Sequence, residues 1–318
     1  MNIEYLVSIL KKLGLKKGDV VYCSSNIGIF ATTSLGFNKK KICKLIFDSI
    51  FKVIGTNGML VVPTFTYSFC NNEIFDIRKT PSKVGIFSEY IRKLPNSNRS
   101  KDPIFSVAAV GKKSKSLISK LSISCFGKNS VWERLLKCNA FILNLNVDGS
   151  IAPYIHYFEK INNCKFRFDK KFYGKIKIGK ETLNAQAIYY VRDLNNKYSL
   201  AYHKAVMDDA YKIKKAKKIN IKSGFVYGIR FQDSYKTFLR RIKNEPFFVT
   251  LGGKKISKIL KKYFTNEKLK NLSNYQKLFE KLNKVFHLNF TTLKKEKNSL
   301  KNLKKEIIRK IQLKYFNY

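Results

Sequence analysis

The sequence has few acidic residues, no ordered cysteine spacing and no long apolar run. Its 318 residues contain no stretch of about 18 apolar residues, so no membrane-spanning helix is expected. The six cysteines are scattered and include no C-x-x-C, which excludes a disulfide framework and a cysteine-rich zinc site. Disorder is excluded because 44% of the residues are hydrophobic and 14% are aromatic. The start, MNIEYLVSILKKLG, lacks the cleavage site of a signal peptide, and this favours a cytoplasmic protein.

Acidic residues number 21 against 64 lysines and arginines, which gives a formal net charge of +43. Such a charge attracts nucleic acid, anionic membrane surfaces and phosphorylated small molecules such as nucleotides and coenzyme A. The excess is mostly lysine, and together with the richness in Asn, Ile, Phe and Tyr it equally fits drift toward A/T-rich codons. Nucleic acid is disfavoured as a ligand, because proteins that recognise it depend on arginine and on motifs that this sequence lacks. The shortage of carboxylates also argues against a polycationic ligand.

Strand and helix patterns alternate in the first half of the chain, which predicts an α/β fold. Glycines after two of the helical patterns, Gly14 and Gly55, predict where those helices end. The predicted helices cover residues 1–13, 38–54, 114–121 and 130–137, with a further helix opening after Ser150. The predicted strands cover residues 19–23, 59–67, 106–110 and 141–145.

The second half divides into a β-rich block and a basic end. Short β-rich pieces at 176–178, 187–191 and 225–228 lie among polar turns. Between residues 254 and 314, 19 Lys+Arg stand against 4 Glu, with apolar residues at helical spacing. We therefore predict a main domain over residues 1–245 and a basic helical C-terminal extension over residues 246–318. The extension fits binding to an anionic membrane surface or nucleic acid, or a helix pair that forms a homodimer, and the sequence leaves these open.

Only one of the three histidines has a carboxylate at helical spacing. His156 and Glu159 are three residues apart, so a helix places them on one face, where the carboxylate can hold one ring N–H and make the other nitrogen more basic. A general base needs this arrangement, although the pair alone equally fits a surface contact. Zinc is disfavoured, because no second His or Cys lies at ligand spacing. We interpret His203 and His287 as structural or surface residues.

Six blocks in the first 165 residues match one family in order and spacing. They are Gly18-Asp19-Val20-Val21 with Ser24, Ser25 and Gly28; Gly55-Thr56 and Gly58 with Val62 to Tyr67; Thr80-Pro81-Ser82 with Gly85; Arg99-Ser100 with Pro103 and Ser106; Phe126-Gly127 with Ser130; and His156 with Glu159. In these blocks the sequence resembles the aminoglycoside 3-N-acetyltransferase family, whose members transfer acyl groups from acyl-CoA and differ in fold from the GNAT acetyltransferases. The resemblance implies a mixed central sheet flanked by helices, acetyl-CoA or another acyl-CoA as co-substrate, and no metal.

The resemblance also assigns candidate site residues. His156 would be the base and Glu159 the residue that orients it. Residues expected to bind the cofactor are Ser24, Ser25, Asn26, Ile27, Gly28, Thr80, Arg99, Ser100, Pro103, Ser106 and Phe126, and those expected to bind the acceptor are Thr66, Tyr67 and Asp76. The turn of residues 24–28 suits either the thioester oxyanion or the CoA pyrophosphate, and Arg99 suits a CoA phosphate. These residues also have structural alternatives: Ser100 could cap a helix, Ser106 could start a strand, and the glycines could permit turns.

Two departures from the family pattern bear on the substrate. Antibiotic-modifying members usually have His where this chain has Asp102, and Thr where it has Pro153. The missing His and the shortage of acids favour an anionic, nucleotide-linked deoxyamino sugar for surface glycan synthesis, as in the polysaccharide branch of the family. Aminoglycoside acetylation with antibiotic resistance is the first alternative. A non-enzymatic protein that binds polyanions or the inner face of the membrane is the alternative from another class.

Overall fold

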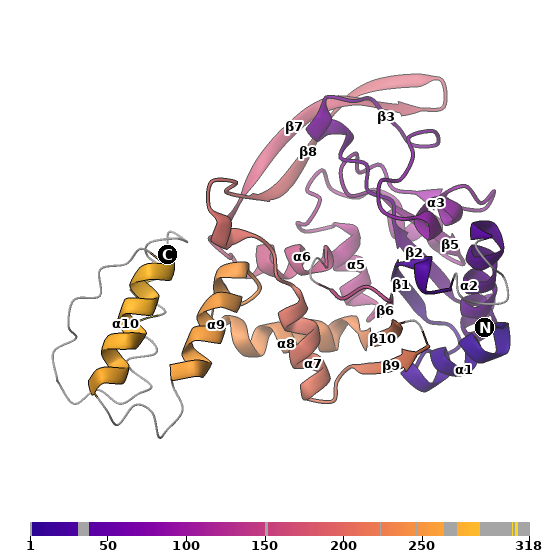
Figure 1. Cartoon of the computed structure of the whole chain (residues 1–318). Coiled ribbons are helices and arrows are strands. Elements are labelled where there is room, and N and C mark those ends of the chain that lie inside the picture. The colour runs from indigo at the N-terminus through magenta and orange to yellow at the C-terminus, as the bar shows by residue number, and fades with distance from the viewer. Residues whose placement is uncertain are drawn as a thin grey trace.

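The centre of the molecule is a seven-stranded sheet (Figure 1). The computed structural model describes residues 2–30, 38–149, 152–222, 224–245, 247–263, 272–286, 307, 309 and 310. The strands run in the order β4 (Asn98–Arg99), β5 (Val107–Gly111), β2 (Met59–Pro63), β1 (Val20–Ser25), β6 (Phe141–Leu145), β10 (Gly224–Arg230) and β9 (Lys217–Ile221). The three middle strands are parallel, and the outer strands join them in antiparallel pairs. The sheet is therefore mixed, as the resemblance implied.

Helices cover both faces of this sheet, because successive side chains of each strand point to opposite sides. On β1, Val21 and Cys23 enter one apolar core and Tyr22 enters the other. The first core is completed by α1 (Ile3–Leu13), α2 (Lys39–Ile54) and α3 (Ile86–Arg92). The second is completed by α5 (Val131–Lys137), α6 (Tyr154–Ile161), α7 (Lys204–Lys212) and α8 (Phe231–Ile242), while the short α4 (Ser114–Ile118) lies beside β5. The result is a three-layer α/β/α arrangement.

Local capping signals set the first helices where the sequence predicts them. The Asn2 side chain accepts a hydrogen bond from the amide of Tyr5 at the start of α1, and Asn38 does the same for Lys41 at the start of α2. Gly14 ends α1 with φ of 102°, a left-handed conformation that favours glycine. The predicted strands at 19–23, 59–67, 106–110 and 141–145 are likewise present as β1, β2, β5 and β6, although β2 ends at Pro63.

A long hairpin arches away from the main sheet (Figure 1). Its strands β7 (Arg167–Ile178) and β8 (Glu181–Arg192) form a second sheet with β3 (Phe75–Asp76). The sequence predicted only residues 176–178 and 187–191 of it. The remainder was missed because exposed lysines such as Lys170, Lys171 and Lys175 break the apolar alternation that marks a strand.

The last described segments are helical. Phe248 lies beside Phe238 of α8 with ring centroids 5.6 Å apart, and α9 (Leu251–Tyr263) and α10 (Leu272–Phe286) follow. Tyr198 contacts Phe286 with a centroid separation of 5.1 Å, so α10 also packs on the main body. The boundary at residue 245/246 stays a prediction, and the predicted cap Ser150 lies outside the described residues. Among the helices described, none combines the length and apolarity needed to cross a membrane.

Candidate active site

The candidate site forms where the parallel strands end. β1 and β6 run side by side, with Ser25 opposite Leu145, and the chain leaves β6 for helix α6. Pro153 lies at the start of α6, where a missing backbone N–H costs no helical hydrogen bond. The carboxyl ends of parallel strands are the usual place for a ligand in α/β proteins. Helix α6 therefore places His156 and Glu159 at the edge of the sheet where ligands usually bind.

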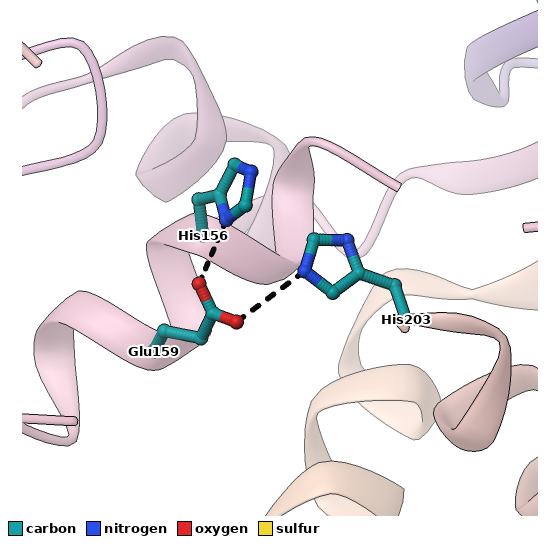
Figure 2. Close-up of side chains that lie close together, drawn as sticks. All are labelled: His156, Glu159 and His203. Carbon is teal, nitrogen blue, oxygen red and sulfur yellow. Dashed lines mark hydrogen bonds and ion pairs between the residues drawn. The ribbon is translucent and has the colours of Figure 1, made fainter. Parts of the chain in front are cut away.

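Glu159 is the centre of a buried cluster of three partners. Its Oε2 lies 2.7 Å from Nδ1 of His156 and 2.6 Å from Nε of Arg167, and its Oε1 lies 3.3 Å from Nε2 of His203. Figure 2 shows the carboxylate between the two imidazoles, one from its own helix and one from the start of α7. Arg167 comes from the first position of β7. The carboxylate itself is fully buried.

The hydrogen bonds define where the protons lie. Nδ1 of His203 accepts a hydrogen bond from the amide of Ala152 at 2.9 Å, so its Nε2 must carry the proton that faces Glu159. An ionised Glu159 only accepts, and Nδ1 of His156 is therefore the donor in that pair. This leaves the lone pair of His156 on Nε2. The imidazole is held in the tautomer that a general base requires.

The charges within the cluster keep His156 neutral. Burial, followed by the positive Arg167, lowers the pKa of His156 to about 3, against the pull of Glu159. Burial alone would raise the pKa of Glu159, but Arg167 and the two imidazoles hold it well below its usual value. At neutral pH the cluster thus contains an ionised Glu159 carboxylate and a neutral His156 imidazole, with the Arg167 guanidinium beside the carboxylate.

His156 lines a cavity of about 470 Å³. Phe126 packs edge-on against its ring, with centroids 5.2 Å apart, and Tyr67 and Phe105 continue this aromatic wall. The full lining is Tyr67, Phe105, Pro153, His156, Arg167, Phe168, Lys170, Phe172, Tyr189, Val191, Arg192, Asp193, Leu194, Leu200 and Ala201. Two predicted site residues, Tyr67 and His156, thus lie on one cavity, with Phe126 against His156.

A second cavity of about 730 Å³ shares Phe105 with the first. Ser100 and Pro103, both predicted to bind the cofactor, lie on its wall together with Lys101 and Lys120. Asp102 is also on this wall, and its Oδ1 accepts hydrogen bonds from the amides of Ile104 and Phe105 at 2.9 and 2.8 Å. The serines, the lysines and the position beside the His156 cavity, with Phe105 on both, suit an extended, phosphorylated cofactor.

Arg99 is held in the protein interior. Its Nε lies 3.2 Å from the hydroxyls of Thr64 and Ser106, and Nη2 donates to the Thr64 carbonyl at 2.7 Å. Nη1 donates to the carbonyls of Ile77, at 3.3 Å, and of Thr80. Three predicted cofactor residues, Thr80, Arg99 and Ser106, are thus brought together, but by hydrogen bonds that tie loops to the sheet. Binding of a CoA phosphate by Arg99 stays a prediction and would require some of these bonds to be exchanged.

The other predicted residues lie apart from the two cavities. Residues 24–28 form the end of β1 and a tight turn, in which the amide of Asn26 donates to Leu145 and that of Gly28 to the Asn26 side chain. Thr66 is buried and donates to the carbonyl of Pro103. The Asp76 carboxylate accepts from the amides of Arg78 and Lys79, which closes a turn beside β3. Their predicted binding roles remain predictions.

Sequence reasoning missed two members of the cluster. The sequence alone predicts a structural or surface role for His203 and indicates no role for Arg167. Both reach Glu159 from other elements, across 44 and 8 residues of sequence. The scarcity of histidine could have drawn attention to His203, but nothing in the local pattern indicates a contact between α6 and the start of α7.

The two imidazoles and the carboxylate also match a metal-ligand set by residue type and distance, since their ligand atoms lie within 4.8 Å of one another. The bonding opposes this use. A metal bound to Nε2 of His203 would require the ring proton to lie on Nδ1. Nδ1 instead accepts a hydrogen bond from the amide of Ala152, so it carries no proton. Arg167 already places a positive charge on Glu159. The cluster therefore fits proton handling better than metal binding.

Comparisons with known proteins bear on the family and the fold. A family model described as aminoglycoside 3-N-acetyltransferase matches residues 33–236. Among solved structures, aminoglycoside acetyltransferase AAC(3)-Xa is 17% identical with a TM-score of 0.67, covering 77% of this chain and 93% of its own. AAC-IIIb in binary complex with CoASH is 14% identical with a TM-score of 0.66, and the match covers 76% of this chain and 96% of that one. AAC-VIa bound to sisomicin is 16% identical with a TM-score of 0.66, and the match covers 76% of this chain and 97% of that one. A search of curated protein sequences finds no significant match.

Proposed function

The chain belongs to the aminoglycoside 3-N-acetyltransferase family and is a CoA-dependent N-acetyltransferase, and from this premise we propose that its acceptor is the primary amine of a nucleotide-linked amino sugar. The role of His156 as general base is supported by its fixed tautomer and by its position on the wall of the 470 Å³ cavity. The nucleotide-linked acceptor is supported by the charge of the same wall.

The proposed reaction is a direct transfer. The amine nitrogen attacks the thioester carbon, the C–N bond forms, and the C–S bond breaks with loss of the CoA thiolate. The proton on nitrogen passes to Nε2 of His156, which becomes an imidazolium. Glu159 stabilises that charge through Nδ1–H, and Arg167 and His203 hold the carboxylate in position. The catalytic role thus belongs to His156 and Glu159.

The cavity wall favours an anionic acceptor over a polycationic one. It includes the cationic side chains of Arg167, Lys170 and Arg192 and the carboxylate of Asp193. Arg167 is paired with Glu159, so Lys170 and Arg192 carry the excess positive charge of the wall. An aminoglycoside carries several ammonium groups and would be repelled by this excess of positive charge, whereas the phosphates of a nucleotide sugar would be attracted. Three further statements stay predictions beside this proposal. They are a role in glycan synthesis, attachment to the inner face of the membrane through the basic extension, and a homodimer.

The acceptor is tested by thiol release from acetyl-CoA against dTDP-, UDP- and GDP-linked amino sugars, with kanamycin and gentamicin in the same panel. We expect turnover with at least one nucleotide-linked amino sugar and none with the two antibiotics. Turnover with the antibiotics, with no nucleotide sugar accepted, would replace the proposal by the aminoglycoside alternative.

The pH profile provides a second expectation. Because the base must be neutral, activity is lost as pH falls through the pKa of His156 in the folded protein. Burial and Arg167 lower that pKa below the ordinary value of about 6.5. We therefore expect kcat to stay level from pH 8 down to about pH 6, and to fall only at lower pH. A kcat profile measured at saturating substrates that breaks at pH 6.5 or above, at the same pH for acceptors whose amines differ in pKa, would contradict this environment for His156.

A further inference from the structure

The base of the β7–β8 hairpin supplies one side of the cavity that His156 lines. Phe168 and Lys170 come from β7 and Arg192 from the end of β8, and we call these three side chains the hairpin wall. Sequence reasoning assigned no role to any of them. They combine an aromatic ring with two positive charges on the same cavity.

Like charges face each other at the base of the hairpin. Arg167 and Arg192 are directly opposite on the paired strands, an arrangement of like charges that destabilises a sheet. Glu159 neutralises Arg167, but Arg192 donates to a backbone carbonyl, that of Asp193 at 3.2 Å. No ion pair to Arg192 occurs among the described residues. An anionic ligand in the cavity would offset this charge.

Aromatic surface is exposed beside these charges. Phe168 is 52% exposed. By contrast, Phe172 on β7 and Tyr189 on β8 pack against each other, with ring centroids 6.4 Å apart. Lys170 lies with its ammonium 5.2 Å from the ring centroid of Phe172, a contact that favours a position beside the cavity. An exposed ring next to cationic side chains is the combination that binds a base by stacking and its phosphates by charge.

We propose that the hairpin wall binds the nucleoside diphosphate part of a substrate, with Arg192 and Lys170 on the phosphates and Phe168 on the base. The inference rests on the proposed function, because it uses the same cavity. Two substrates carry this chemistry, namely the nucleotide-linked acceptor and CoA, whose adenosine carries a diphosphate.

Equilibrium binding separates the two sources without turnover. Calorimetric titrations would use dTDP, UDP, GDP and CoA as probes on the full chain. We expect Arg192→Gln and Lys170→Gln each to weaken binding of one probe by about 10-fold or more, and Phe168→Ala by about 5- to 100-fold. Lys171→Gln is the matched control, because Lys171 neighbours Lys170 on β7, is exposed, and does not line the cavity.

Each outcome has a defined meaning. Weaker binding of a free nucleoside diphosphate with unchanged CoA binding assigns the wall to the acceptor, and the reverse assigns it to CoA. Equal affinity of the wild type and all three variants for every probe, with unchanged melting temperatures, overturns the proposal. His156→Ala keeps probe binding if the wall acts as proposed, even if no acceptor in the panel is turned over, so failure of the wall and failure of the proposed reaction are distinguishable.

Discussion

Replacement of His156 by alanine is expected to lower kcat by about 10²- to 10⁴-fold while CoA still binds with nearly wild-type affinity. The variant loses Nε2, the ring nitrogen that carries the lone pair, from a residue that lines the cavity, so the amine has no base there. We expect CoA binding to be retained because Ser100 and Pro103, which are predicted to bind CoA, lie on the second cavity, whose lining does not include His156. Thiol release under single-turnover conditions and calorimetry with CoA measure the two quantities.

His203 provides the matched control for this loss. It contacts the same carboxylate and is also buried, but it does not line the cavity. His203→Gln retains a side chain that can donate to Glu159, and we expect it to keep most of the activity. Wild-type kcat in His156→Ala would exclude His156 as the base. An equal loss in both variants, with folding preserved, would show that the cluster as a whole matters and that no single imidazole is the base.

Local signals account for the parts of the fold that the sequence predicted well. α1 and α2 begin at asparagine caps and end at Gly14 and Gly55, all of which are visible within a few residues of sequence. The His156–Glu159 contact is of the same kind, because three residues on a helix fix the distance. Such features need no knowledge of how distant elements pack.

The residues that sequence reasoning missed or left open depend on distant packing. Arg167 and His203 reach Glu159 only after β7 and α7 are placed against α6. Arg99 has the chemistry of a phosphate ligand, yet its guanidinium is surrounded by carbonyls and hydroxyls of three other segments. Residue type predicts what a side chain can bind, whereas burial decides what it does bind.

Replacement of Glu159 by glutamine is expected to affect both stability and activity. It leaves Arg167, whose side chain is 3% exposed, as a buried cation without its carboxylate. Removing one partner of a buried ion pair costs about 3–5 kcal/mol, because the remaining charge stays desolvated. The melting temperature should then fall by roughly 4–8 °C, and kcat should fall as well, since a neutral amide no longer selects the His156 tautomer or stabilises its charge.

The double variant Glu159→Gln with Arg167→Met separates these two effects. Methionine fills a volume similar to that of the arginine stem and removes the uncompensated charge, and replacing both members of a buried ion pair is often neutral for stability. We therefore expect the melting temperature of the double variant to return most of the way to that of the wild type, while kcat stays as low as in the single variant. The reason is that Arg167 acts on Glu159, whereas Glu159 acts on the base. If the double variant melts as low as Glu159→Gln, the buried charge of Arg167 is not the cause of the instability. If it regains activity, the negative charge of Glu159 is not what His156 requires.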